Sequence, residues 1–503
     1  MESETAFDVL VVGAGLSGIN TAYRLQTQLP GRSFAVFESR DAIGGTWDFW
    51  RYPGFRTDSS IAVFRFAWHP WPHRTNMPEG HVIKEYMEDA AAAQGIDKKI
   101  LFRHRVTAQT WSSDEQQWTV NVEVARDDGS VEQKVFTASW LIGASGYYRY
   151  GPPVPPDIRG LGSFGGEVVH PQSWDGSVSY AGKRVVIVGS GATAVTLLPS
   201  IAKTAASVTM LQRSPSYVAS APAFDDGIPI VRSLLPARWA GALNWWWHIL
   251  LETILVGILL RFPNYGRREL IDGVRKRLPA GFDVEKHFNP RYAPFTQRLC
   301  FCPSSDFFKA LRKPHVDVVT DTIETVIETG IRLASGQVLE TDMIITATGL
   351  TLELLSGVAA FVDGVRVDST LGQRYVWNGA MIEGVPNYGF IHGYTAATWT
   401  PGADVRALQM VKVMKRAQRN GARSATPYLA PQERERLPKK PLLTLSSTYV
   451  VAALDKLPIN ADVGPWRIGS TWLSDRWHLM FGSMAGLRYA GGKQRDGSKQ
   501  RDE

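Results

Sequence analysis

The chain has 503 residues and only two cysteines, Cys300 and Cys302. With a single residue between them, they cannot supply a disulfide framework, a four-ligand zinc site or a redox-active Cys-x-x-Cys pair, and we expect no metal. The excess of one sign of charge is also small, because the chain has 55 Lys and Arg and 48 Asp and Glu, which gives a net charge of +7. This mild excess suits an anionic small molecule and does not predict a nucleic-acid partner.

Long hydrophobic runs are also scarce. The chain opens on the polar segment Met1–Thr5, so we expect no secretory signal and a cytoplasmic protein. The longest apolar run, Trp245–Leu260, is shorter than the roughly 20 residues that span a bilayer. We interpret it as a buried or surface-docked helix. Arginines at its flanks, including Arg238, Arg261 and Arg268, leave peripheral membrane association open as the alternative.

Two segments share one pattern, in which a continuous apolar strand leads into a glycine turn and a helix start. The first, Asp8–Gly18, carries Gly-x-Gly-x-x-Gly at Gly13, Gly15 and Gly18. These glycines permit a tight turn, close approach to a pyrophosphate, and close packing of helix on strand, respectively. Glu38 ends the next expected strand, where a carboxylate accepts hydrogen bonds from ribose hydroxyls. The first segment therefore predicts an FAD site.

The second segment, Arg184–Ala194, has Gly189 and Gly191, with Ala194 at the third position, which serves packing alone. Its next expected strand ends without an acid, and Arg213 follows instead. A guanidinium matches the oxygens of a 2′-phosphate, so this turn predicts NADPH rather than NADH. A surface arginine at a strand end is the alternative.

Alternation of buried strands with helices predicts an α/β fold with two Rossmann-like dinucleotide-binding domains, for FAD and NADPH, and a helical insertion in the second. The proline-rich segment Gly151–Pro156 is expected to be a linker. We expect the following division: residues 1–148 and 351–490 in the FAD-binding domain, 149–216 and 303–350 in the NADPH-binding domain, 217–302 in the insertion, and 491–503 in a disordered tail.

Between the two turns, Phe164–Asp175 reads FxGxxxHxxxWD. With this motif beside two dinucleotide turns, the chain resembles class B flavoprotein monooxygenases, specifically the Baeyer–Villiger branch. The related N- and S-oxygenating enzymes typically carry Tyr or Phe where Trp174-Asp175 stands. Further segments extend the resemblance over nearly the whole chain, and together they are most similar to the shorter subgroup typified by the ethionamide-activating monooxygenase: Gly44–Trp47, Arg51–Asp58, Phe288–Tyr292, Gln297–Cys300, Gly384–Asn387 and Gly393–Thr395.

The resemblance implies an FAD-containing, NADPH-dependent monooxygenase. Such an enzyme inserts one oxygen atom of dioxygen next to a ketone carbonyl, by way of a C4a-peroxyflavin, and yields an ester or lactone. The implied substrate is a small apolar ketone. An S- or N-oxygenating flavin monooxygenase with the same cofactors is the alternative. A non-catalytic flavoprotein that senses redox state is a third hypothesis, from another class.

An anionic oxidant needs a fixed cation in a dry site, and Arg298 is the candidate. Asp58 is its candidate partner, because an unpaired buried arginine is costly. A structural ion pair for Arg298 and a helix N-cap for Asp58 are the alternatives, and His170 is expected to couple the domains. The expected cofactor residues fall into two groups: Gly13, Gly15, Ser17, Gly18, Glu38, Thr46, Trp47, Asp58 and Val106 around FAD, and Arg56, Thr57, Gly189, Ser190, Gly191, Ala192, Thr193, Arg213 and Ser214 around NADP.

Overall fold

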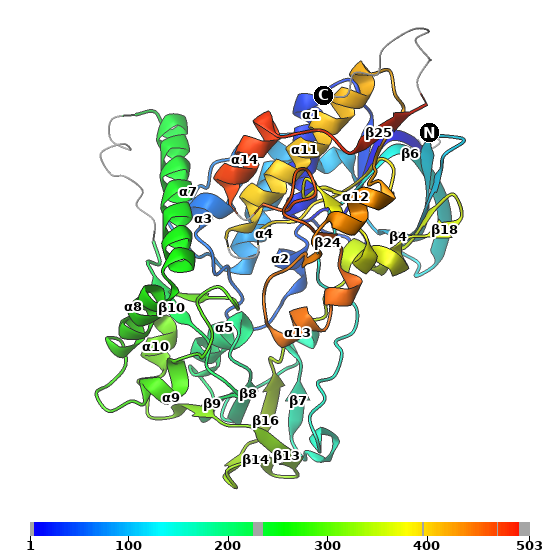
Figure 1. Cartoon of the computed structure of the whole chain (residues 1–503). Coiled ribbons are helices and arrows are strands. Elements are labelled where there is room, and N and C mark those ends of the chain that lie inside the picture. Colours follow the sequence, from blue (N-terminus) through cyan, green and yellow to red (C-terminus); the bar gives the residue numbers. More distant parts are fainter. Residues whose placement is uncertain (1–4, 225–234, 395–396, 470, 492–503) are drawn as a thin grey trace.

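The molecule has an upper and a lower lobe, each built around its own sheet (Figure 1). One of the two glycine turns follows a strand of each sheet. The computed structural model describes residues 5–224, 235–394, 397–469 and 471–491. Residues 492–503 of the expected tail, and Thr395 of the resemblance segments, lie outside the described residues.

The upper lobe is built around β1 (Ala6–Val12), which pairs in parallel with β2 (Phe34–Phe37) on one side and with β6 (Val131–Gly143) on the other. β21 (Tyr388–Phe390) also pairs in parallel with the end of β6. Residues far apart in the sequence therefore share this sheet. Its other strands are β3 (Ile100–Leu101), β4 (His104–Ser112), β5 (Gln117–Ala125), β17 (Ala359–Val362), β18 (Val365–Arg366), β19 (Val376–Trp377) and β20 (Met381–Ile382).

Helices pack around this sheet, and the contact between α1 and α11 brings the first and last parts of the lobe together. The helices are α1 (Leu16–Gln28), α2 (Thr46–Phe49), α3 (Ile61–Phe64), α4 (Gly80–Ala93), α11 (Trp399–Arg419), α12 (Pro431–Arg436), α13 (Thr448–Val451) and α14 (Trp472–Phe481). The upper lobe also contains two small antiparallel strand pairs: β22 (Ser424–Pro427) with β25 (Leu487–Ala490), and β23 (Lys440–Pro441) with β24 (Ile459–Asn460).

The lower lobe has a five-stranded parallel sheet in the order β12-β9-β8-β16-β7. Its elements are β7 (Glu167–Val169), β8 (Arg184–Val188), α5 (Ala192–Ile201), β9 (Ser207–Gln212), α10 (Asp306–Ala310), β12 (Val316–Thr320) and β16 (Met343–Thr346). A small antiparallel sheet lies at its foot: β13 (Ile323–Ile327), β14 (Gly330–Leu333) and β15 (Val338–Glu340). Two parallel-stranded units of this kind confirm the expected fold class, whereas the domain boundaries stay predictions.

The expected insertion is enclosed by two short strands, β10 (Val218–Ala221) and β11 (Cys300–Pro303), which pair in parallel. Between them lie α7 (Ala237–Arg261), α8 (Pro263–Arg275) and α9 (Val284–Phe288). The apolar run lies in α7. Within the described residues, Trp239–Arg261 is long and apolar enough to cross a membrane by length and composition alone, with 22% of its most apolar window buried. The expectation that this segment is too short is therefore wrong, because the helix extends beyond the apolar run.

The FxGxxxHxxxWD motif forms the edge of the lower sheet and its junction with the linker. β7 pairs with β16, and the His170 ring then accepts a hydrogen bond from the Gln172 amide at 3.1 Å. The Gln172 side chain donates to the carbonyls of Arg149 (3.0 Å) and Gly151 (2.6 Å) in the segment that joins the lobes. Burial lowers the pKa of His170, which favours the neutral ring that this contact requires.

The glycine turn after β1 depends on backbone contacts that leave no room for a side chain. A Cβ at Gly18 would lie 1.8 Å from the Gly13 carbonyl oxygen. A Cβ at Gly13, where φ is +107°, would lie 2.8 Å from the Ala144 carbonyl oxygen at the end of β6. Because glycine has no side chain at these two positions, α1 can lie close to β1 and the turn can lie close to β6.

We expect Gly18→Ala to destabilise the upper lobe by about 1–3 kcal/mol or more, because the new methyl group meets backbone that cannot move aside. Thermal unfolding of the purified variant measures this. Gly31→Ala is the matched control, since nothing lies within 4 Å of its Cβ position. Equal melting of the two variants would contradict the packing argument.

Candidate functional site

A cavity of about 1130 Å³ lies where the carboxyl ends of β1, β2 and β6 meet the insertion. Its wall includes the first glycine turn, α3, the segment before β11 and one side of α7. We call it the central cavity. Pockets for drug-sized ligands measure about 300–1,000 Å³. The volume of the central cavity therefore suits a larger molecule, such as a dinucleotide. Its position also fits, since α/β folds bind ligands at the carboxyl ends of their strands.

Most of the first predicted group lines this cavity, whereas the second glycine turn does not. Gly18 packs beneath the first turn, as described above. The predicted residues in the wall are Gly13, Gly15, Ser17, Glu38, Thr46, Trp47, Arg56, Thr57, Asp58, Val106 and Arg298. The residues that lie elsewhere, around the carboxyl ends of β8 and β9, are Gly189, Ser190, Gly191, Ala192, Thr193, Arg213 and Ser214.

Glu38 ties the ends of the first two strands together at the cavity wall. One carboxylate oxygen accepts a hydrogen bond from the Ala14 amide at 2.8 Å, and the other accepts from the Arg40 amide at 3.1 Å. The Gly13 amide donates to the Phe37 carbonyl at 2.7 Å. The side chain is 7% exposed, so a buried carboxylate lies beside the turn, and a carboxylate can accept hydrogen bonds from ribose hydroxyls.

Both helices that follow the glycine turns have N-termini without a side-chain cap. Gly15 precedes α1 and Gly191 precedes α5, and neither first turn contains an acidic residue. The first amides of a helix have no partner within the helix, and the helix dipole makes that end positive. Each turn can therefore accept the pyrophosphate of a dinucleotide.

Arg298 reaches the central cavity from the segment just before β11. Its Nη2 donates to the Tyr147 hydroxyl at 2.9 Å, and its Nη1 lies 3.9 Å from Asp58 Oδ2, the outer limit of an ion pair. Its Nε is buried and has no hydrogen-bond partner in the protein. The side chain is 34% exposed. The guanidinium therefore keeps donor capacity that the surrounding protein does not use.

Asp58 does not cap a helix, because α3 begins at Ile61 with Ser60 as its N-cap residue. The carboxylate lies in the cavity wall and faces Arg298 instead. The alternative interpretation of Asp58 as an N-cap is thereby excluded. The long Asp58–Arg298 distance makes this a loose pair, in which Tyr147 provides the closer contact.

Sequence reasoning missed an aromatic group in the wall. The Tyr147 ring stacks on Trp399 with centroids 5.1 Å apart and planes 20° apart, and Trp399 Nε1 donates to Ser17 Oγ at 3.0 Å. The hydroxyls of Tyr147 and Tyr148 are 3.1 Å apart, and burial raises the pKa of Tyr148. A signal was present, because Ala-Ser-Gly-Tyr-Tyr follows a buried strand at the ligand-binding edge. No local pattern marks Trp399.

Two arginines of the predicted NADP group have different surroundings. Arg56 Nη1 pairs with Asp306 of α10 at 2.7 Å, and its buried Nη2 has no partner in the protein. Arg213 is exposed at the end of β9 and contacts the Thr448 hydroxyl at 3.3 Å. The Arg213 guanidinium is therefore accessible to a phosphate group from solvent.

Cys300 and Cys302 lie in β11 with both thiols buried and reduced. Burial raises the pKa of each thiol to about 12. They are core residues next to the Arg298 segment.

The groups in this site fit the two cofactors that the sequence suggested. Two uncapped helix N-termini can receive pyrophosphates, Glu38 can receive a ribose, and the cavity is larger than a simple substrate needs. Unused donors on Arg56 and Arg298 point to a polar ligand, because buried polar atoms are normally satisfied. The fold and the site together define a flavoprotein with two dinucleotide-binding units.

Comparison with known proteins identifies the family. The model of the FMO-like family, described as flavin-binding monooxygenase-like, matches residues 6–244. The FAD-containing monooxygenase EthA of Mycolicibacterium smegmatis is 42% identical over 470 residues, which cover 93% of this chain and 94% of that protein. The protein of the same name from Mycobacterium tuberculosis is 39% identical over 486 residues, 96% of this chain and 97% of that protein.

Among solved structures, a steroid monooxygenase bound to NADP has the same fold, with a TM-score of 0.71 and 20% identity over 97% of this chain and 100% of that one. This chain belongs to the flavin-binding monooxygenase-like family and is a flavin-dependent monooxygenase. The family and the fold class predicted from the sequence are confirmed. The roles of the individual site residues stay predictions.

Proposed function

We propose that this protein is an FAD-containing, NADPH-dependent Baeyer–Villiger monooxygenase that converts an apolar ketone into an ester or lactone. FAD, when bound and reduced by NADPH, supplies the reaction with dioxygen. The observation that carries the proposal is the environment of Arg298, a permanent cation in the cavity wall with an unused donor. The relatives named above are FAD-containing monooxygenases, and a neighbour of the same fold holds NADP.

Arg298 would act on negative charge. As the carbonyl carbon of a ketone becomes tetrahedral, charge develops on its oxygen, and a fixed guanidinium stabilises that charge without having to reorganise. The hydrogen bond to Tyr147 orients the guanidinium. The Asp58 carboxylate, 3.9 Å from Nη1 of Arg298, balances the charge of the guanidinium and leaves its N–H donors available. Asp58 is therefore proposed as a positioning residue.

The remaining site residues would bind and orient the two cofactors. Glu38 and the uncapped N-terminus of α1 would hold the ribose and pyrophosphate of FAD, and Arg213 the 2′-phosphate of NADPH. The flavin wall would be completed by Ser17, Thr46, Trp47 and Val106. The nicotinamide nucleotide would contact Arg56, Thr57, Gly189, Ser190, Gly191, Ala192, Thr193 and Ser214.

The reaction is tested by product identification. We expect apolar ketones, incubated with the holoenzyme, NADPH and ¹⁸O-labelled dioxygen, to yield esters or lactones that carry one labelled oxygen, detected by mass spectrometry. Thioethers and amines are run in parallel. Sulfoxides or N-oxides without any ester would replace this proposal by the S- or N-oxygenating alternative. NADPH consumption without an oxygenated product for any compound would favour the redox-sensing hypothesis.

We expect Arg298→Ala to retain FAD and to bind NADPH but to lose about 100- to 1000-fold in ester formation, the usual cost of removing one preorganised donor. Absorbance of the bound flavin and the rate of product formation measure the two properties separately. Arg126→Ala, which removes an exposed arginine paired with Glu132, is the control. Ester formation at the wild-type rate in Arg298→Ala would refute the assignment.

We expect Arg213→Ala to raise the KM for NADPH about 10-fold or more and to leave the KM for NADH nearly unchanged, because only NADPH carries the 2′-phosphate. Steady-state kinetics with both coenzymes measures this. Arg213→Lys keeps the charge but loses the forked geometry, so an intermediate KM is expected. If the ratio of the two KM values does not change in Arg213→Ala, Arg213 does not bind the phosphate.

A further inference from the structure

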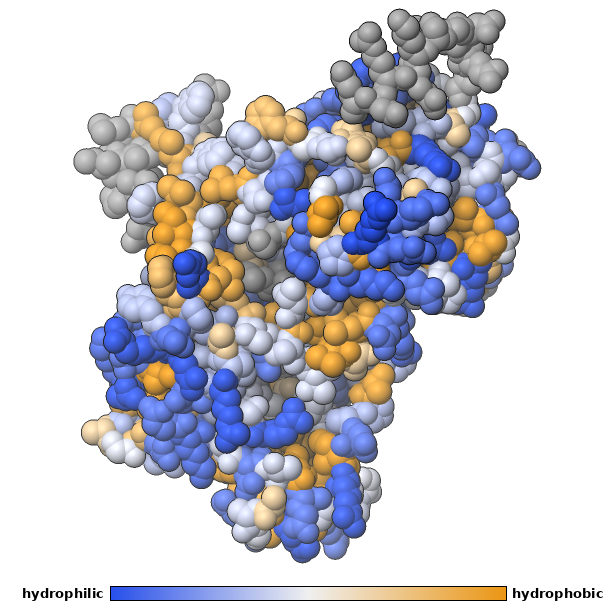
Figure 2. Space-filling model, in the orientation of Figure 1, coloured by the Kyte–Doolittle hydropathy of each residue, from blue (hydrophilic) through white to orange (hydrophobic). Residues whose placement is uncertain are grey.

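The side of α7 that faces away from the protein is apolar. Trp246, Trp247, Leu250 and Ile254 are each about half exposed, at 51, 50, 45 and 49%. Figure 2 shows hydrophobic residues gathered over α7, at the left of the molecule. Large apolar side chains seldom cluster on the surface of a protein that meets only water, so this cluster indicates an interaction surface.

α14 extends this cluster. Its Trp472 ring packs edge-on against the Trp246 ring of α7, with centroids 5.0 Å apart. On its outer side, α14 exposes Trp477 and Phe481, whose rings are 4.6 Å apart. We define the apolar face as Trp246, Trp247, Leu250 and Ile254 of α7 together with Trp477 and Phe481 of α14.

α7 differs from an ordinary surface helix, which turns its polar residues to water, because its outward side is apolar. Its polar residues Asn244, His248 and Glu252 recur every fourth position and lie on the side toward the protein. His248 and Glu252 line the central cavity. Glu252 also accepts hydrogen bonds from the amide (2.6 Å) and the hydroxyl (3.0 Å) of Thr398, just before α11.

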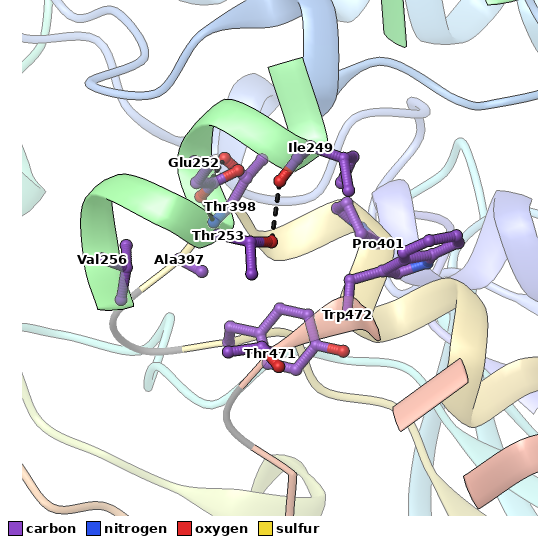
Figure 3. A pocket seen from close by; sticks show the side chains of 10 residues that line it. Ile249, Glu252, Thr253, Val256, Ala397, Thr398, Pro401, Thr471 and Trp472 are labelled. Carbon is purple, nitrogen blue, oxygen red and sulfur yellow. Dashed lines mark hydrogen bonds between the residues drawn. The ribbon is translucent and has the colours of Figure 1, made fainter. Parts of the chain in front are cut away.

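This anchoring holds α7 along the protein rather than across a bilayer. Figure 3 shows Glu252 beside Thr398, and Pro401 and Trp472 on the neighbouring elements, around a small pocket of about 20 Å³. Buried residues at both ends and in the middle of α7 pack against the rest of the chain: Ala240, Trp245, Ile249, Val256 and Leu259. A helix fixed along its length in this way can lie in the surface of a membrane, where such helices enter about 5–10 Å.

The charges around α7 favour lipid over a protein partner. Arg261 ends α7 and Arg268 lies in the following helix, α8; both are exposed, and each lies over an exposed aromatic ring, of Phe262 at 5.4 Å and of Tyr265 at 5.8 Å. Aromatic and basic residues together are typical of the region of lipid headgroups. The one acidic residue of α7, Glu252, is turned inward, so no acid on α7 opposes an anionic surface.

We propose that the apolar face docks this protein onto a membrane surface that contains anionic lipid. The mouth of the central cavity lies beside this face, since Leu251 and Leu255 of α7 are half exposed and also line the cavity. An apolar substrate dissolved in the lipid can then enter the cavity without crossing water. This second step rests on the proposed ketone chemistry, whereas docking itself does not.

Flotation of the holoenzyme with vesicles tests docking. We expect the protein to float with vesicles of phosphatidylcholine and phosphatidylglycerol and to bind vesicles of phosphatidylcholine alone more weakly. The triple variant Trp247→Gln/Leu250→Gln/Ile254→Gln changes three residues of the apolar face that do not line the central cavity. Its binding to the anionic vesicles should fall at least about tenfold, because three apolar side chains lose their burial.

The control is Val131→Gln/Val135→Gln in β6, on the opposite side of the upper lobe, where the two valines are 55 and 56% exposed (Figure 1). Its vesicle binding and the flavin content of both variants should match the wild type. Two results would overturn the proposal: no flotation of the wild type, or equal flotation of the wild type and the triple variant. A wild-type dimer that the triple variant converts to a monomer, without vesicle binding, would also overturn it and identify a contact between two copies.

Entry from lipid is tested with two ketones of one series. The triple variant should oxidise a long-chain ketone supplied in anionic vesicles at least about tenfold more slowly than the wild type, and a short, water-soluble ketone equally fast. Equal rates on the vesicle-borne ketone would overturn entry from lipid. If neither protein forms ester but the wild type floats, the proposed function fails and docking stands.

Discussion

The central cavity depends on backbone contacts at the first glycine turn. A Cβ at Gly18 would overlap the Gly13 carbonyl, so α1 can approach β1 closely only because residue 18 has no side chain. Gly13, also without a side chain, lies against the end of β6. Three strand ends and one helix N-terminus are thereby gathered at one edge of the sheet. The wall groups that follow the strands of this sheet take their positions from that edge, including Glu38 beside the turn and Tyr147 after β6.

The second requirement is that the lower lobe and its insertion reach this edge. The pairing of β10 with β11 carries Arg298 to Tyr147, across 151 residues of sequence. The ion pair of Arg56 with Asp306 joins the loop after α2 to α10 in the same region. The site is therefore composite, and the side chain proposed to stabilise negative charge comes from a different lobe than the turn proposed to hold FAD.

Local sequence patterns predicted the parts of the site that a short segment defines. Both glycine turns, Glu38 and Arg213 follow buried strands directly, so strand order and hydrogen-bonding chemistry were enough to place them at strand ends. The stacking of Tyr147 on Trp399 could not be predicted, since it joins residues 252 positions apart that only the assembled fold brings together. Residues 217–302 were expected to form a helical insertion, and the pairing of β10 with β11 in this segment is a non-local contact of the same kind.

The orientation of α7 illustrates another limit of sequence reasoning. Its composition showed an apolar run and flanking arginines, but composition does not say which side of a helix faces the protein. The burial of Trp245 and Ile249 shows which side of α7 faces the protein, and the exposure of Trp247 and Leu250 shows that an apolar side also faces outward.

The two buried thiols of β11 have a chemical consequence for an enzyme that handles dioxygen. Thiols react with peroxides as thiolates, and oxidation follows the fraction of thiolate and its access to solvent. With a pKa of about 12, Cys300 and Cys302 carry almost no thiolate at neutral pH. Burial and the raised pKa values therefore both lower the reactivity expected of the two thiols toward a peroxide, although Cys300 adjoins the Arg298 segment.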